Sequence, residues 1–111
     1  MLKNNLPPIH PGLYIKEALP ALGVNQAELA RVLGCSRQIV SDIINGRRGL
    51  SVEMCFKLSG VIGSSPEMWA RLQTNYDLKK AGKNGAVRAA VEQVRKRAAK
   101  IRPQRMEFSE V

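Results

Sequence analysis

Apolar residues recur along most of the chain with the spacing of α-helices. Between residues 11 and 78, apolar residues repeat every three or four positions with polar or charged residues on the intervening positions of most turns, as expected when one face of each helix packs on a core. The alternation of β-branched and aromatic residues with polar ones that is typical of strands is missing. The pattern therefore predicts an all-α fold.

Start and stop signals divide this stretch into five predicted helices. The first follows Pro11 and breaks near residues 20–23. The others follow N-caps or openings at Asn25, Ser36, Ser51 and Ser65. The first three of these end at Gly34, residues 45–46 and Gly63, and the last includes Leu78. Glu28, three residues after Asn25, would complete a capping box.

The predicted core is mostly aliphatic, because only 5% of the residues are aromatic. The side chains expected to face it are Leu13, Ile15, Ala18, Leu19, Ala27, Leu29, Ala30, Leu33, Ile39, Val40, Ile43, Met54, Cys55, Leu58, Val61 and Ile62.

The length of 111 residues allows one small domain with a short extension. Residues 80–85, KAGKNG, have the composition of a linker. We therefore expect a five-helix domain over residues 1–81 and an extension over residues 82–111.

The extension carries the charge of the chain. Residues 79–105 hold ten Lys and Arg against Glu92, a net +9, which equals the formal charge of the whole protein. Residues 86–101, AVRAAVEQVRKRAAKI, fit an amphipathic basic helix that ends before Pro103. A weak apolar face suggests that this helix folds on a partner, and a poorly ordered extension is the alternative. Its apolar positions are Val87, Ala90, Val91, Val94, Ala98 and Ile101.

This charge makes nucleic acid the leading partner. Two cysteines without C-x-x-C spacing and the single His10 do not compose a metal site. We expect no enzyme, cofactor, metal or small-molecule substrate. Without a signal peptide or an apolar segment long enough to span a membrane, the expected location is the cytoplasm, with both thiols reduced.

Residues 26–45, QAELARVLGCSRQIVSDIIN, have the spacing of a helix-turn-helix. Ala30 would allow close approach of the two helices, Gly34 would open the turn, and Val40 would anchor the second helix. An ordinary αα-hairpin shares this spacing, so the exposed residues must distinguish the two.

The second helix of this pair would present Arg37, Gln38, Ser41 and Asp42 in its first half, where a recognition helix meets base edges. Arg can bind guanine and Gln can bind adenine through two hydrogen bonds. Arg47 and Arg48, just past this helix, would face phosphate.

Residues 25–51, NQAELARVLGCSRQIVSDIINGRRGLS, resemble the Xre/Cro-type helix-turn-helix of lambdoid phage repressors. The frame around them, PPIHPG in front and SVEM and SPEMWARLQTNYDL behind, is similar to HigA antitoxins of type II toxin–antitoxin modules. The resemblance covers about residues 10–81. It implies a lambda-repressor-like fold and an antitoxin that represses its own operon as a homodimer on double-stranded operator DNA. It also implies neutralisation of a RelE-like, mRNA-cleaving toxin.

The resemblance implies roles for individual residues. Base readout would fall to Arg37, Gln38 and Ser41, and backbone contact to Asn25, Gln26, Asn45, Arg47 and Arg48. Asp42 departs from the pattern, because an acid on this face would repel phosphate. It could accept a hydrogen bond from a cytosine amino group or pair with a neighbouring Arg, and we favour the pairing.

The last predicted helix carries a stripe of Met68, Trp69, Leu72 and Tyr76. Such stripes commonly cover their own core, but recognition of two half-sites favours a homodimer interface here. Two other functions stay open: a stand-alone Xre/Cro-type repressor without a toxin, and a basic RNA-binding or nuclease protein.

Overall fold

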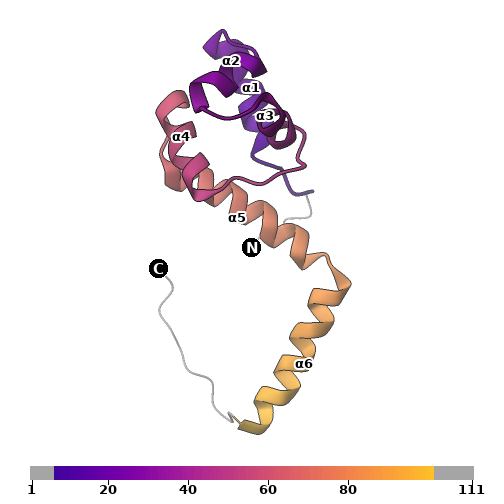
Figure 1. Ribbon diagram of the computed structural model, residues 1–111. Helices are drawn as coiled ribbons and strands as arrows, with labels where there is room; N and C mark the ends of the chain where they lie inside the picture. The colour runs from indigo at the N-terminus through magenta and orange to yellow at the C-terminus, as the bar shows by residue number, and fades with distance from the viewer. Residues whose placement is uncertain (1–6, 102–111) are drawn as a thin grey trace. The chain divides into compact units, whose positions relative to one another are not determined.

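The computed structural model describes residues 7–101. Within this range the chain consists of α-helices joined by turns and irregular segments, and it contains no strand. The helices are α1 (Gly12–Leu22), α2 (Gln26–Leu33), α3 (Arg37–Ile44), α4 (Val52–Ile62), α5 (Pro66–Gly82) and α6 (Gly85–Ile101), as Figure 1 shows. The all-α prediction is confirmed, with five helices in the predicted order and a helical extension.

Helices α2, α3 and α4 begin where the sequence supplies side-chain caps. The Oδ1 of Asn25 accepts a hydrogen bond from the amide of Glu28 at 2.8 Å, and the Glu28 carboxylate accepts one from the amide of Asn25 at 2.9 Å. This capping box satisfies two backbone donors at the start of α2. The hydroxyls of Ser36 and Ser51 each accept from the amide three residues later, at 3.1 Å. The predicted starts of α2, α3 and α4 are thus confirmed.

The core lies between α1, α2, α3, α4 and the first turn of α5. Its buried apolar residues are Ile15, Leu29, Ala30, Leu33, Val40, Ile43, Ile44, Met54, Cys55, Leu58 and Trp69. Most were predicted, but Leu13 is 45% exposed and was predicted wrongly. Val61 and Ile62 are only partly buried, at the edge of this core.

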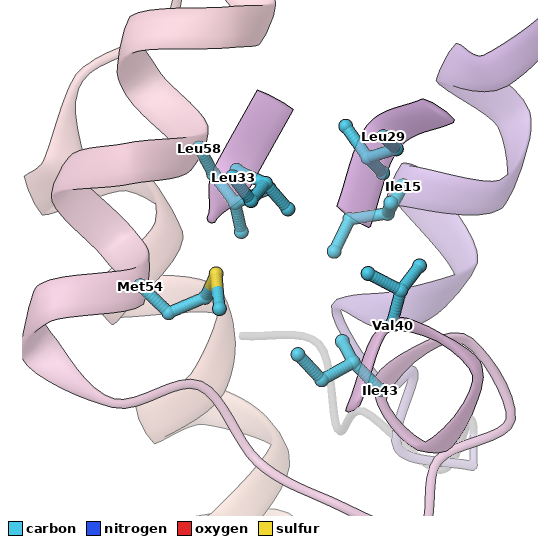
Figure 2. Close-up of a pocket in the computed structure, with 7 residues that line it drawn as sticks. All are labelled: Ile15, Leu29, Leu33, Val40, Ile43, Met54 and Leu58. Carbon is cyan, nitrogen blue, oxygen red and sulfur yellow. The ribbon is translucent and has the colours of Figure 1, made fainter. Parts of the chain in front are cut away.

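A small cavity of about 10 Å³ remains between α1, α2, α3 and α4. Figure 2 shows the seven side chains that surround it, all of them apolar: Ile15, Leu29, Leu33, Val40, Ile43, Met54 and Leu58. A water molecule needs about this volume together with polar partners, which this lining does not offer. The cavity is a packing defect rather than a ligand site.

α1 begins directly against the end of α3. A Cβ added at Gly12 would overlap the carbonyl oxygen of Ile43 and lie 2.9 Å from the Cα of Ile44. The amide of Gly12 donates to Nδ1 of His10 at 2.9 Å. Because Gly12 has no side chain, the backbone of α1 can pack directly against the backbone at the end of α3.

Contacts divide the chain into two compact units, Met1–Lys79 and Lys80–Val111. In the second unit, Val87, Val91 and Val94 of α6 are exposed, so the expected apolar stripe exists on a helix. Pro103, expected to end this helix, lies outside the described residues. None of the helices in residues 7–101 is long and apolar enough to cross a membrane. Over the same range, no group of three metal-ligating side chains occurs.

Candidate nucleic-acid interface

α2 and α3 are joined by a turn at Gly34. Gly34 has φ of 73°, a left-handed conformation that glycine adopts without strain. The amide of Cys35 donates to the carbonyl of Ala30 at 3.0 Å, which closes the end of α2. Ala30 and Val40 are both buried where the two helices meet. The three residues that indicated a helix-turn-helix thus have the expected places.

α3 is buried on one side and exposed on the other. Val40, Ile43 and Ile44 fix it to the core, whereas Arg37 and Gln38 in its first turn are exposed. Both side chains therefore extend from a helix whose orientation is set by packing. Such a rigid base is what precise readout of a nucleic acid requires.

Ser41 is less accessible than the other two predicted base-reading residues. It is partly buried, and the Nδ2 of Asn45 donates to its carbonyl at 2.9 Å and to its hydroxyl oxygen at 3.3 Å. The hydroxyl of Ser41 can still donate, because it only accepts in this contact. Asn45, expected at the DNA backbone, also closes the last turn of α3.

Asp42 binds two of the predicted DNA-contacting residues. Its Oδ1 accepts from Nε2 of Gln38 at 2.8 Å, and from Nε and Nη2 of Arg47 at 3.1 and 2.9 Å. These hydrogen bonds, first that from Gln38 and then that from Arg47, lower the pKa of the Asp42 carboxyl below its ordinary value. The predicted pairing of Asp42 with an Arg is confirmed.

The loop after α3 folds back on Asp42 through its backbone as well. The amides of Arg47 and Arg48 donate to the carbonyl oxygen of Asp42 at 2.8 and 3.2 Å. Gly46, with φ of 76°, makes this return possible. The side chains of Arg47 and Arg48 are exposed and start from a loop held by hydrogen bonds.

The remaining predicted backbone contacts lie at the start of α2. Asn25 is exposed, but its side chain and amide both take part in the capping box. Gln26 is partly buried in the first turn. The N-terminus of a helix favours an anion such as phosphate, although Glu28 places a carboxylate in the same turn.

The stripe on α5 has a different role from the one expected for Trp69. Trp69 is only 2% exposed and belongs to the core, so it offers no surface to a second copy, and its assignment to a dimer interface is corrected. Met68 and Leu72 are partly buried against the same core. The ring of Tyr76 meets that of His10 edge to face, with 4.8 Å between centroids.

Two features were missed by sequence reasoning. The spacing of Gln38 and Asp42, four residues apart on one helix, is the signal that could have indicated their contact. The close approach at Gly12 had no such signal, because it depends on how α1 meets α3.

Comparisons with known proteins identify a helix-turn-helix domain in this chain. The helix-turn-helix family HTH_3 matches residues 15–69, which span α2, α3 and α4. Virulence-associated protein A′ of Dichelobacter nodosus is 46% identical over 85 residues, 76% of this chain and 74% of that protein.

The solved structures similar to this chain in sequence and fold include two Pseudomonas aeruginosa proteins bound to DNA. The Pseudomonas aeruginosa protein PA4674, in complex with its 18-base-pair operator DNA, is 36% identical with a TM-score of 0.66, over 74% of this chain and 90% of that one. The antitoxin HigA of the same organism, solved with the higBA promoter, is 34% identical with a TM-score of 0.65, over 78% and 90% of the two chains.

Proposed function

Because the chain belongs to the Xre-type helix-turn-helix family HTH_3, and proteins similar to it include HigA antitoxins, we propose that it is an antitoxin that represses its own operon. Proteins of this kind act by binding rather than by catalysis. An antitoxin of this kind has two partners, operator DNA and a toxin.

One observation carries the DNA-binding part: Arg37 and Gln38 are exposed in the first turn of α3, while the opposite side of α3 is fixed in the core. In this arrangement α3 enters the major groove with its N-terminal half against the bases. Arg37 reads guanine through O6 and N7, and Gln38 reads adenine through N6 and N7. Ser41 adds a single hydrogen bond deeper along the helix.

The residues around α3 provide contacts to phosphate. Arg47 and Arg48 supply charge from the loop after α3, and Asn45 supplies an amide at its end. Asn25 and Gln26 lie at the N-terminus of α2, where the helix dipole and the free amides favour an anion. These contacts position α3 in the groove and do not themselves select a sequence.

Two copies of the chain bind a palindromic operator in this proposal. A single recognition helix reads only a few base pairs, and twofold symmetry doubles the contact when half-sites lie about 34 Å apart, one turn of DNA. The partly buried Met68, Leu72 and Tyr76 on α5 are candidates for the surface between the copies. Light scattering on the free protein measures this directly: a dimer is expected, and a monomer at micromolar concentration contradicts this part.

The second partner is a RelE-like toxin that cleaves mRNA. The similarity to the antitoxin HigA supports this part. Co-expression tests it: a reading frame for a small protein next to this gene should arrest growth when induced alone, and the arrest should be relieved when this chain is also produced. If no neighbouring frame is toxic, the protein is a stand-alone repressor, and the DNA-binding part is unaffected.

Selection from random DNA tests the DNA-binding part. Wild-type protein is used to select duplexes of about 30 base pairs, long enough for two half-sites. A palindromic sequence should emerge and bind about a thousandfold or more tighter than random duplex. Recovery of no consensus would contradict sequence-specific binding.

A further inference from the structure

Asp42 holds two proposed DNA-contacting residues with one oxygen atom. Gln38 lies one helical turn before it on α3, and Arg47 returns to it from the following loop, both within 3.1 Å of Oδ1. The Asp42 side chain is 20% exposed, whereas that of Arg47 is 57% exposed. A recessed carboxylate therefore connects an exposed base-reading side chain to an exposed phosphate-binding one.

We infer that Asp42 is a specificity-determining positioning residue, which orients the amide of Gln38 for base readout and restrains Arg47 from indiscriminate phosphate binding. This inference rests on the proposed DNA-binding function. Asp42 itself needs no contact with DNA.

The contact with Asp42 fixes which end of the Gln38 amide faces the DNA. An ionised carboxylate only accepts hydrogen bonds, so it must face the NH₂ group of Gln38. The second N–H and the carbonyl oxygen of that amide then remain for DNA, and these are the donor and acceptor that adenine N7 and N6 require. Without the carboxylate, the terminal amide can rotate about a broad torsional minimum and present either group.

The same carboxylate reduces the attraction of Arg47 for DNA in general. The ion pair offsets the charge of the guanidinium with a carboxylate 2.9 Å away. Because the pKa of Asp42 is lowered, this carboxylate is ionised at any pH used for DNA binding. Two N–H groups of Arg47 point to Asp42, and its other donors remain for a correctly placed phosphate.

Removal of the Asp42 side chain leaves the loop in place, because the amides of Arg47 and Arg48 bond to its backbone carbonyl. Asp42→Ala therefore tests the carboxylate rather than the loop. Asp42→Asn keeps the shape and offers a neutral amide that can face Gln38 with either group. Glu53→Gln is a matched control, since Glu53 is an exposed acid paired with Lys57 on α4 and its loss changes the net charge equally.

The experiment compares these variants on the duplex selected by wild-type protein, on its single-base-pair substitutions, and on random duplex. For Asp42→Ala, random-duplex affinity should rise about fivefold per protomer at physiological salt, because one further phosphate contact adds about 0.9 to the salt slope. The ratio of selected to random affinity should fall at least about fivefold per half-site. Among the single-base-pair substitutions, discrimination should be lost mainly at the base pair that Gln38→Ala also affects. Asp42→Asn should fall between wild type and Asp42→Ala, and Glu53→Gln should leave the ratio unchanged.

A double variant distinguishes positioning from a general effect. If Asp42 acts through Gln38, then Asp42→Ala should cost no further discrimination at that base pair when Gln38 is already Ala. An unchanged ratio in Asp42→Ala, or additive losses in the double variant, would overturn the inference while the DNA-binding function stands. A wild-type protein that selects no sequence would overturn both.

Discussion

Gly12→Ala should destabilise the domain strongly, although it replaces glycine by the best helix-forming residue. The added Cβ would overlap the carbonyl oxygen of Ile43 and lie 2.7 Å from the carbonyl carbon of the same residue. An ordinary van der Waals contact of a Cβ atom is 3.4 Å or longer. Both obstacles are backbone atoms of α3, which cannot rotate away as a side chain would. The start of α1 must therefore move away from α3.

The size of this effect follows from the cost of overpacking, typically about 1–3 kcal/mol. We expect a loss of about 3 kcal/mol in the free energy of unfolding, because neither backbone can yield without unpacking Ile15 or Ile43 from the core. For a domain of this size, that loss lowers the melting temperature by roughly 12–24 °C. Since α3 loses its support, operator affinity should also fall.

Gly60→Ala is the matched control. Gly60 lies within α4, and a Cβ there would meet nothing within 4 Å. The same substitution should stabilise the protein by about 0.5–1 kcal/mol, because alanine restricts the unfolded chain and favours helix. Thermal unfolding followed by circular dichroism compares the two. A Gly12→Ala protein that melts at or above the wild-type temperature would refute the close approach of α1 and α3.

Two further substituted positions and one truncation test other parts of the structure. Asn25→Ala should lower the free energy of unfolding, measured with urea, by about 1 kcal/mol, because it removes the capping box. Asn25→Asp should keep the cap but weaken DNA binding, because its carboxylate repels phosphate. Equal stability of wild type and Asn25→Ala would count against the cap. Trp69→Ala should lower the free energy of unfolding by about 3–5 kcal/mol, because it truncates a core side chain. The milder Trp69→Phe should leave the oligomeric state unchanged in light scattering. If Trp69→Phe shifts the protein to a monomer, Trp69 contributes to a subunit interface after all. Truncation after Ala81 removes the basic residues of α6 and should weaken binding to all DNA sequences. The slope of log K against log salt should become shallower by about 0.9 for each lost phosphate contact. A slope equal to that of the full chain would exclude a DNA role for the extension.

The local features of the fold could be predicted from the sequence because their causes are local. Caps such as Asn25 and Ser36 bond to amides three residues away, and glycines with positive φ such as Gly34 end helices where a side chain would be strained. Helical periodicity likewise placed most of the buried residues. These signals need no knowledge of how the helices pack.

Features that depend on packing between helices were harder to predict from the sequence. The stripe containing Trp69 could equally cover its own core or a partner, and only the position of α5 distinguishes the two. Leu13 fits the apolar period of α1 but lies on its exposed side. In the candidate interface, Asp42 was expected to pair with an Arg, whereas its contact with Gln38 was not foreseen because each residue was assigned a separate role.

The central claim is that α3 reads bases while the loop after it holds phosphate, and a comparison of Arg37→Ala with Arg48→Ala tests it most directly. Affinities are measured on the selected duplex and on random duplex over a range of salt concentrations. Arg37→Ala should lose about 1–3 kcal/mol per half-site on the selected duplex and little on random DNA. Arg48→Ala should weaken both alike and reduce the salt slope by about one unit per half-site. Equal losses on both duplexes for Arg37→Ala would contradict base readout by α3.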